Sequence, residues 1–122
     1  MLGDALEGEA RDLAQAQVET ALAVAQEGQG FPVVLMSGGE CTVTRRGNGV
    51  GGPNAEFVLA AALALRGHPK IHVLACDTDG VDGAAEVAGA IAGPTTLAMA
   101  EAMGISSQAQ LDQNNAHSFF EA

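Results

Sequence analysis

Residues 53–83 read PNAEFVLAAALALRGHPKIHVLACDTDGVDG, and this stretch combines a helical pattern, an apolar strand and a loop. Pro53 suits the first turn of a helix, because the N–H that proline lacks is not needed there. The apolar residues after it predict a helix to about Arg66, and the apolar run 71–76 predicts a central strand. Helices that alternate with strands indicate an α/β layer, in which helices pack on a sheet.

The sequence before this stretch extends the same pattern. Apolar residues at helical spacing predict a first helix over about residues 9–26. The apolar run 33–36 and the alternating run 41–45 predict two strands, and Gly38-Gly39 between them predicts a hairpin turn. Both strands are expected to join the sheet.

The sequence after it predicts shorter elements. Residues 87–92 are small and apolar and predict a short strand or a turn of helix. Three short helices are expected to follow, with caps at Thr95, at Ser106 or Ser107, and at Asn114 or Asn115. The fold class is therefore α/β, a layered sheet of mixed strands with helices packed on it, in a single domain over residues 1–122.

Composition limits the classes of partner. The chain has 122 residues and a net charge of −10, from 15 acidic against 5 basic residues. This balance disfavours a nucleic acid partner, because phosphate binding needs clustered Lys and Arg. No stretch approaches the ~20 apolar residues of a membrane span, and no signal peptide is visible. Cys41 and Cys76 lack metal-ligand or CxxC spacing, which favours free thiols and a cytoplasmic protein.

A glycine-rich loop is the first candidate site. Residues 47–52, GNGVGG, fit the pattern G-x-G-x-x-G between a strand and a helix, where backbone N–H groups can approach a phosphate, and Arg46 stands beside them. Pro53 argues against a dinucleotide site, because the helix begins only after the last glycine. Pro53-Asn54 also excludes a Walker A loop, which requires Lys-Ser/Thr at that place. A flexible connection is the structural alternative.

An acidic loop is the second candidate. Asp77, Asp79 and Asp82 follow the predicted central strand, where open α/β sheets bind ligands. Carboxylates there can hold Mg²⁺ or accept a proton from a substrate hydroxyl, whereas an ordinary Asp-Gly turn is the alternative. Residues 37–40, SGGE, either offer N–H groups to an anion or form a tight turn. The three histidines have no ligand spacing, so each is expected to be structural or on the surface.

Several blocks together resemble one known family. They are residues 36–44 (MSGGECTVT), 46–49 (RGNG), Gly51-Gly52, Asn54, Glu56-Phe57 and 78–83 (TDGVDG), with 2–4, 7–11 and 114–121 at the two ends. In this order they resemble the glycerate 2-kinase family, whose carboxyl-terminal part is called the MOFRL domain and whose members are often labelled hydroxypyruvate reductase. Pro53 stands where a number of members have Arg, Ala55 replaces a usual Gln, and Cys41 replaces a usual Thr.

The resemblance implies ATP-dependent phosphorylation of D-glycerate at its 2-hydroxyl, with Mg²⁺. It places the active site in a cleft between this domain and a larger amino-terminal domain, which is the expected partner. Asp79 and Asp82 are then the catalytic residues and the Mg²⁺ ligands. The residues expected to bind substrate or phosphate are Ser37, Gly38, Gly39, Glu40, Arg46, Gly47, Asn48, Gly49, Gly51, Gly52 and Asn54.

Three functions stay open at this stage. The first is the carboxyl-terminal domain of a glycerate 2-kinase, inactive without its amino-terminal domain. The second is an NAD(P)H-dependent hydroxypyruvate reductase domain, and the third is a binding module without chemistry. The sequence also leaves the oligomeric state open, a homodimer included.

Overall fold

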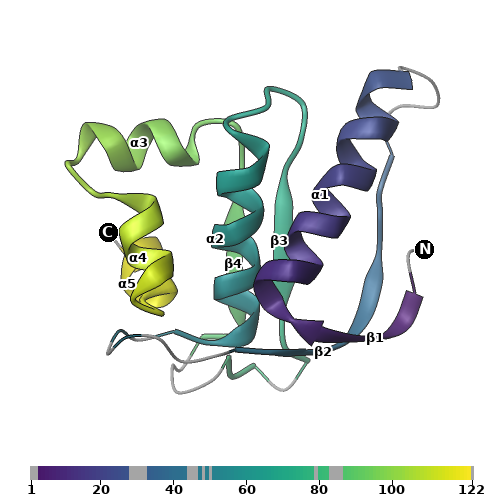
Figure 1. Ribbon diagram of the computed structural model, residues 1–122, viewed down its shortest axis with the longest axis horizontal. Coiled ribbons are helices and arrows are strands. Elements are labelled where there is room, and N and C mark those ends of the chain that lie inside the picture. Colours follow the sequence, from purple (N-terminus) through teal and green to yellow (C-terminus); the bar gives the residue numbers. More distant parts are fainter. Residues whose placement is uncertain are drawn as a thin grey trace.

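Helix α2 (Pro53–Leu65) is the centre of the domain. The computed structural model describes residues 3–27, 33–43, 47, 49, 51–78, 80–82 and 87–121. In Figure 1, α2 lies between α1 and the carboxyl-terminal helices, in front of strands β3 and β4. Val58 and Leu59 are fully buried, and the helix ends at Arg66, whose φ of 51° is left-handed. The predicted helix from Pro53 to about Arg66 is confirmed.

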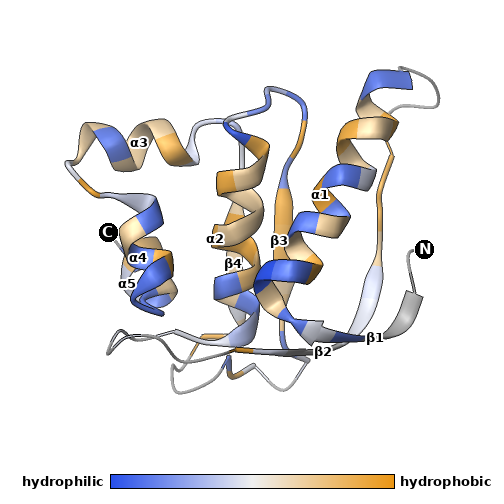
Figure 2. Cartoon of the chain, in the orientation of Figure 1, coloured by the Kyte–Doolittle hydropathy of each residue, from blue (hydrophilic) through white to orange (hydrophobic). Residues whose placement is uncertain are grey.

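Helix α1 (Ala10–Glu27) packs along α2, and it confirms the helix predicted over 9–26. Ala14 and Val18 form a core cluster with Ala61 of α2, where small side chains let the two helices approach closely. Figure 2 shows polar and apolar residues alternating around α1, whereas α2 is apolar over most of its length. This difference in hydropathy matches their places, since α1 has one face toward solvent and α2 is packed from several sides.

The described strands form two separate pairs. Strand β1 (Gly3–Glu9) lies parallel to β2 (Ser37–Thr42), and β3 (Val73–Cys76) lies antiparallel to β4 (Gly89–Ala92). The strand predicted over 71–76 is confirmed in its last four residues. The run 87–92, for which a short strand or a turn of helix was predicted, forms a strand in its last four residues. The α/β class with helices packed on a sheet is confirmed as well, with parallel and antiparallel pairs.

The predictions for residues 33–45 were wrong in part. Residues 33–36 have no regular structure, and the side chain of Val34 is 77% exposed. Gly38 and Gly39 do not turn the chain but lie inside β2, with Gly39 opposite Leu6 of β1. The strand β1 itself was not predicted. Pairing with a distant strand decides this region, and glycines have no side-chain pattern that announces it.

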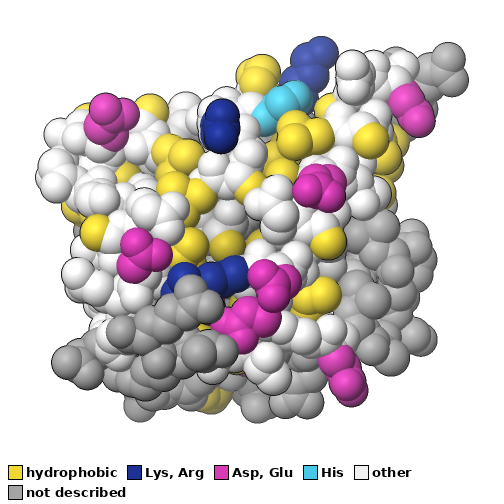
Figure 3. All heavy atoms as spheres, in the orientation of Figure 1, with side chains coloured by type: hydrophobic (Ala, Val, Ile, Leu, Met, Phe, Trp, Pro, Cys, Tyr) yellow, Lys and Arg dark blue, Asp and Glu magenta, His cyan; other side chains and the backbone are white. Residues whose placement is uncertain are grey.

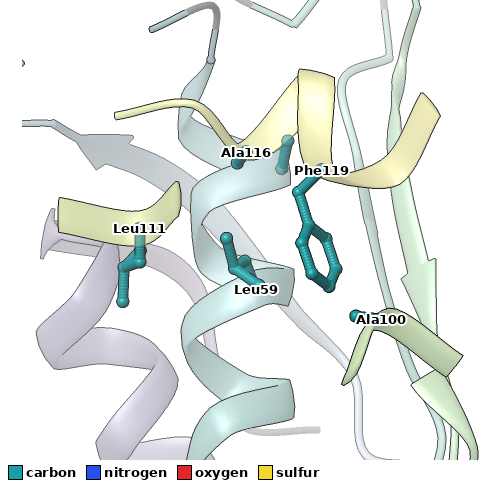
Figure 4. Packing of buried hydrophobic residues seen from close by; sticks show 6 residues of the cluster. Leu59, Ala100, Leu111, Ala116 and Phe119 are labelled. Carbon is teal, nitrogen blue, oxygen red and sulfur yellow. The ribbon is translucent and has the colours of Figure 1, made fainter. Parts of the chain in front are cut away.

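Three short helices complete the domain: α3 (Thr96–Ala102), α4 (Ser107–Asp112) and α5 (Ala116–Glu121). Ser106 caps α4, since its Oγ accepts a hydrogen bond from the Ala109 N–H at 3.3 Å. Thr95 occupies the predicted N-cap position of α3, but its side chain makes no capping hydrogen bond. The neighbouring Thr96 Oγ1 accepts from the Gly93 N–H at 2.9 Å. Figure 4 shows how Leu111 and Phe119 approach Leu59 of α2 from these helices.

Acidic side chains are scattered over the face in view and form no single large patch (Figure 3). Figure 3 shows Asp and Glu side chains spread over this helical face, with apolar side chains visible between the helices. None of the helices in the described ranges has both the length and the hydropathy to cross a membrane.

Candidate functional site

The glycine loop is held against the turn between α4 and α5. The Gly47 N–H donates to Asn114 Oδ1 at 2.9 Å, and the Gly49 N–H donates to the Gln113 carbonyl at 2.9 Å. The backbones approach so closely that a Cβ added at Gly49 would lie 2.3 Å from the Cβ of Asn115. Only glycine allows this contact. These two N–H groups therefore fix the loop to the domain.

The first turn of α2 is capped from a distant loop. Asp82 Oδ1 accepts from the Asn54 N–H at 2.8 Å and from Asn54 Nδ2 at 3.2 Å, while Oδ2 accepts from the Ala55 N–H at 2.8 Å. Gly52, at the N-cap position, has no side chain that can do this. A Cβ at Gly52 would also lie 2.5 Å from the Asp82 carbonyl oxygen, so glycine there makes room for the distant carboxylate.

A histidine completes the surroundings of this carboxylate. His117 Nε2, from α5, lies 2.9 Å from Asp82 Oδ2 and 3.1 Å from the Asp82 carbonyl oxygen. Because a carboxylate has no hydrogen to give, Nε2 carries the hydrogen and donates it. Asp82 is fully buried and His117 is nearly so. The pair joins α5 to the amino-terminal end of α2, where the partial positive charge of the helix also favours a carboxylate.

A second buried polar cluster includes Glu56, which also lies in the first turn of α2. Glu56 is almost fully buried, and its Oε2 lies 3.4 Å from Arg11 Nε of α1. Glu56 Oε1 accepts from Asn114 Nδ2 at 2.8 Å, and Arg11 Nη2 donates to the Leu111 carbonyl. Asn114 thus contacts both Glu56 and Gly47. The cluster ties α1, α2 and the α4–α5 turn to the glycine loop.

The predicted site residues fall into three groups. The first group gathers around the amino-terminal end of α2 and consists of Gly47, Gly49, Gly51, Gly52, Asn54 and Asp82. Ser37, Gly38 and Gly39 lie in β2, where Gln17 Nε2 donates to Ser37 Oγ at 3.0 Å. The third group lies outside the described part of the chain and consists of Arg46, Asn48, Asp79 and the side chain of Glu40.

The predicted Mg²⁺ site rests on Asp79 and Asp82. Across the described ranges, no three His, Cys, Asp or Glu side chains gather in a group able to hold a metal ion. The oxygens of Asp82 face N–H donors from α2 and His117, and these positive ends of N–H bonds do not suit a site for Mg²⁺. The contacts of Asp82 favour anchoring of α2, and metal binding at Asp79 stays a prediction.

Sequence reasoning did not assign Arg11, Glu56, Asn114 or His117 to the candidate functional site. All four stand inside the blocks that carry the family resemblance, which was the one signal that pointed to them. Arg11 and its partner Glu56 are 45 positions apart in the sequence, and Asn114 and Glu56 are 58 positions apart. Local patterns contain no information on pairs at such separation. The expectation that His117 is structural agrees with its burial and contacts.

Comparison of the sequence with known protein families identifies the family of this chain. The sequence profile of the MOFRL family matches residues 33–122. The chain belongs to the MOFRL family. The resemblance noted from the sequence is therefore confirmed, and it includes the glycine loop, α2, the acidic loop and the carboxyl-terminal helices.

Relatives of this MOFRL chain are longer proteins. A protein of Agrobacterium vitis named "Putative hydroxypyruvate reductase" is 40% identical over 126 residues, which cover 100% of this chain and 29% of the relative. The glycerate 2-kinase of Pyrococcus horikoshii is 38% identical, over 92% of this chain and 26% of the relative. The chain spans less than a third of the length of either.

A solved structure supports the fold assignment. The crystal structure of a glycerate kinase from Thermotoga maritima superposes with a TM-score of 0.94 at 31% identity, over 98% of this chain and 30% of that one. Nearly the whole MOFRL chain therefore corresponds to one part of a larger kinase polypeptide.

Proposed function

We propose that the chain is the carboxyl-terminal domain of an ATP-dependent glycerate 2-kinase, which phosphorylates D-glycerate. The observation that carries the proposal is the convergence of the glycine loop, Asn54 and Asp82 at the amino-terminal end of α2, in a chain that is 38% identical to a glycerate 2-kinase. Phosphoryl transfer depends mainly on positioning and charge neutralisation, so it needs groups that are held in place, as Gly47, Gly49 and Asn54 are.

Within this proposal, the loop residues divide into anchors and ligand contacts. Gly47 and Gly49 use their N–H groups to hold the loop against the α4–α5 turn. Arg46 and Asn48 alternate with these anchors along the sequence, and we assign them to the phosphate groups of ATP or to the substrate carboxylate. Arg46 supplies the positive charge, because Pro53 has none.

The acidic loop divides in the same way. Asp82 anchors the loop to α2 through its buried carboxylate. We assign the chemistry to Asp79, three positions earlier, which accepts the proton of the substrate hydroxyl or holds Mg²⁺. When bound, Mg²⁺ neutralises charge on the transferring phosphoryl group.

The amino-terminal domain is the proposed partner, with the active site between the two domains. This chain covers only 29% and 26% of the length of two relatives, which supports a larger protein with a further domain. The chain alone is expected to be inactive, because the nucleotide pocket and further cations come from the partner. A cytoplasmic location and a homodimer stay predictions.

A coupled assay with ATP, Mg²⁺ and D-glycerate tests the proposal. The isolated chain is expected to give no turnover, and the protein completed with an amino-terminal domain is expected to turn over. In the completed protein, Asp79→Asn is expected to lower kcat at least 100-fold, as for loss of a general base. Normal turnover by the Asp79→Asn variant would refute the site assignment.

A reductase is the second candidate, supported by the name of the Agrobacterium vitis relative. The start of α2 at Pro53 argues against it, because the third glycine of a dinucleotide loop belongs inside the helix, whereas Gly52 is the N-cap. Oxidation of NADH by the completed protein with hydroxypyruvate would decide for the reductase. A binding module without chemistry would instead show thermal shifts with ATP or glycerate and no turnover in either assay.

A further inference from the structure

The pair of strands β3 and β4 has one covered face and one bare face. Val73 and Ala92, which are opposite one another in the register, pack with Val58 and Ala62 of α2. Figure 1 shows α2 in front of this pair of strands. Leu74 and Ile91 are also directly opposite one another, and each alternates with residues that face α2. Both are 64% exposed.

The two strands have the composition of a sheet that is covered on both faces. An antiparallel pair with one face in water usually alternates apolar with polar residues. Strand β3 reads VLAC and β4 reads GAIA, so neither places a charged side chain on the bare face, and the Cys76 thiol is its one weakly polar group. Leu74 and Ile91 together form a cross-strand apolar patch, which we call the outer face of β3–β4. A partner that covers this patch would remove its apolar surface from water, which favours association.

We propose that the outer face of β3–β4 is the surface on which the amino-terminal part of the kinase polypeptide docks. This inference rests on the proposed function. The Thermotoga maritima kinase contains this same domain, with a TM-score of 0.94, as only 30% of its chain. The remaining polypeptide of such an enzyme is therefore present in cis and in stoichiometric amount to cover the face.

The position of the face relative to the acidic loop supports this occupant. Strand β3 ends at Cys76, whose side chain is exposed, and the acidic loop begins at Asp77. A domain that covers Leu74 therefore lies next to the loop that carries Asp79. A second copy of the chain fits the face less well, because each copy brings a net charge of −10.

Thiol labelling measures whether the face is covered. The variants Leu74→Cys and Ile91→Cys are made in a Cys41→Ser/Cys76→Ser background, because the native Cys76 is itself exposed beside Leu74. They are made in the isolated chain and in a full-length chimera, in which this chain replaces the matched residues of the Agrobacterium vitis relative. Met99→Cys is the matched control, since Met99 of α3 is 61% exposed. Iodoacetamide labelling is followed by mass spectrometry of the separate peptides.

The expected result is labelling at least tenfold slower in the chimera at positions 74 and 91, with no change at position 99. Equal rates in the two proteins would overturn the proposal. Protection in the isolated chain that grows with its concentration would assign the face to a second copy and would overturn it as well. The kinase assay on the same chimera separates the two proposals: a protected face without turnover refutes only the kinase, and turnover with an accessible face refutes only the docking.

A second measurement does not depend on folding of the chimera. The second protein is the Agrobacterium vitis relative without the residues that match this chain. Isothermal titration calorimetry measures its binding to the isolated chain. The double variant Leu74→Lys/Ile91→Lys is expected to bind at least tenfold more weakly than the wild type. Met99→Lys/Met103→Lys, on residues 61% and 58% exposed, is expected to bind as the wild type does. No binding by the wild type, or equal loss in both double variants, would contradict the docking surface.

Discussion

His117 Nε2 lies 2.9 Å from Asp82 Oδ2, and this buried contact joins the last helix of the domain to the first turn of α2. The same carboxylate accepts the N–H groups of Asn54 and Ala55, both at 2.8 Å. One side chain therefore receives donors from two helices. The position of the glycine loop, which ends at α2, depends on this carboxylate.

The first prediction concerns Asp82. Asp82→Asn is expected to lower the free energy of unfolding by about 2 kcal/mol, because an amide nitrogen or a neutral oxygen replaces an ionised acceptor for buried N–H groups. Urea denaturation of the isolated chain measures it. Asp112→Asn is the matched control, since the Asp112 side chain is 60% exposed and its ion pair with Arg11 spans 3.8 Å. This control variant is expected to change the free energy of unfolding by less than about 0.5 kcal/mol. Equal effects in the two variants would disprove the capping role.

The second prediction concerns the coupling between Asp82 and His117. A double-mutant cycle with Asp82→Asn and His117→Ala is expected to give a coupling energy of about 1 kcal/mol or more, because the two side chains share a buried hydrogen bond. Equilibrium unfolding of the wild type, both single variants and the double variant measures it. Pairing Asp82→Asn with His68→Ala, at the far end of α2, is the control. A coupling energy near zero for Asp82 with His117 would show that their contact does not stabilise the domain.

The third prediction concerns the glycine loop. Gly49→Ala is expected to destabilise the domain by about 1–3 kcal/mol, because the added Cβ would lie 2.3 Å from the Cβ of Asn115 and the backbone must shift. Thermal denaturation followed by circular dichroism measures it. Gly80→Asn is the control, since an added Cβ there meets nothing within 4 Å and its cost is confined to the strain of a φ of 85°, which asparagine bears better than most residues. A Gly49→Ala variant as stable as the control would mean that the loop is not packed against the α4–α5 turn.

The fourth prediction concerns the buried pair of Glu56 and Arg11. Glu56→Leu is expected to cost about 3–5 kcal/mol, because it leaves the Arg11 guanidinium without its buried partner and removes the acceptor for Asn114. Urea denaturation measures the loss. Glu101→Leu changes an exposed residue of α3 in the same way and is expected to alter stability by less than about 0.5 kcal/mol. A small effect of Glu56→Leu would show that Arg11 finds other partners in the folded chain.

Local sequence signals were sufficient for some elements. Pro53 fixes the start of α2, apolar spacing gives α1, and Ser106 caps α4 as its position suggested. These features depend on residues a few positions apart, so a single sequence contains them. The run 71–76 likewise predicted a strand, which forms over Val73–Cys76 with apolar residues on both of its faces.

Other features depend on distant partners and were not predictable. The pairing of β2 with β1 joins Gly39 to Leu6, and nothing near Gly39 announces it. Asp82 stands in a turn-forming sequence, yet its carboxylate caps a helix whose capped residue, Asn54, is 28 positions away. The family resemblance marked the blocks that contain these residues. The resemblance did not distinguish the residues that anchor the glycine loop from the residues that are proposed to contact a ligand.

Asn114 shows how narrowly such a contact restricts the choice of amino acid. Its backbone φ is 55°, its amide nitrogen donates to Glu56, and its amide oxygen accepts from Gly47. Glycine would relieve the backbone but has no amide, aspartate has no hydrogen for Glu56, and glutamine tolerates this φ poorly. Asparagine alone meets all three requirements, so related sequences that keep the glycine loop and the buried glutamate are expected to keep asparagine here, even where the solvent-facing residues around it have diverged.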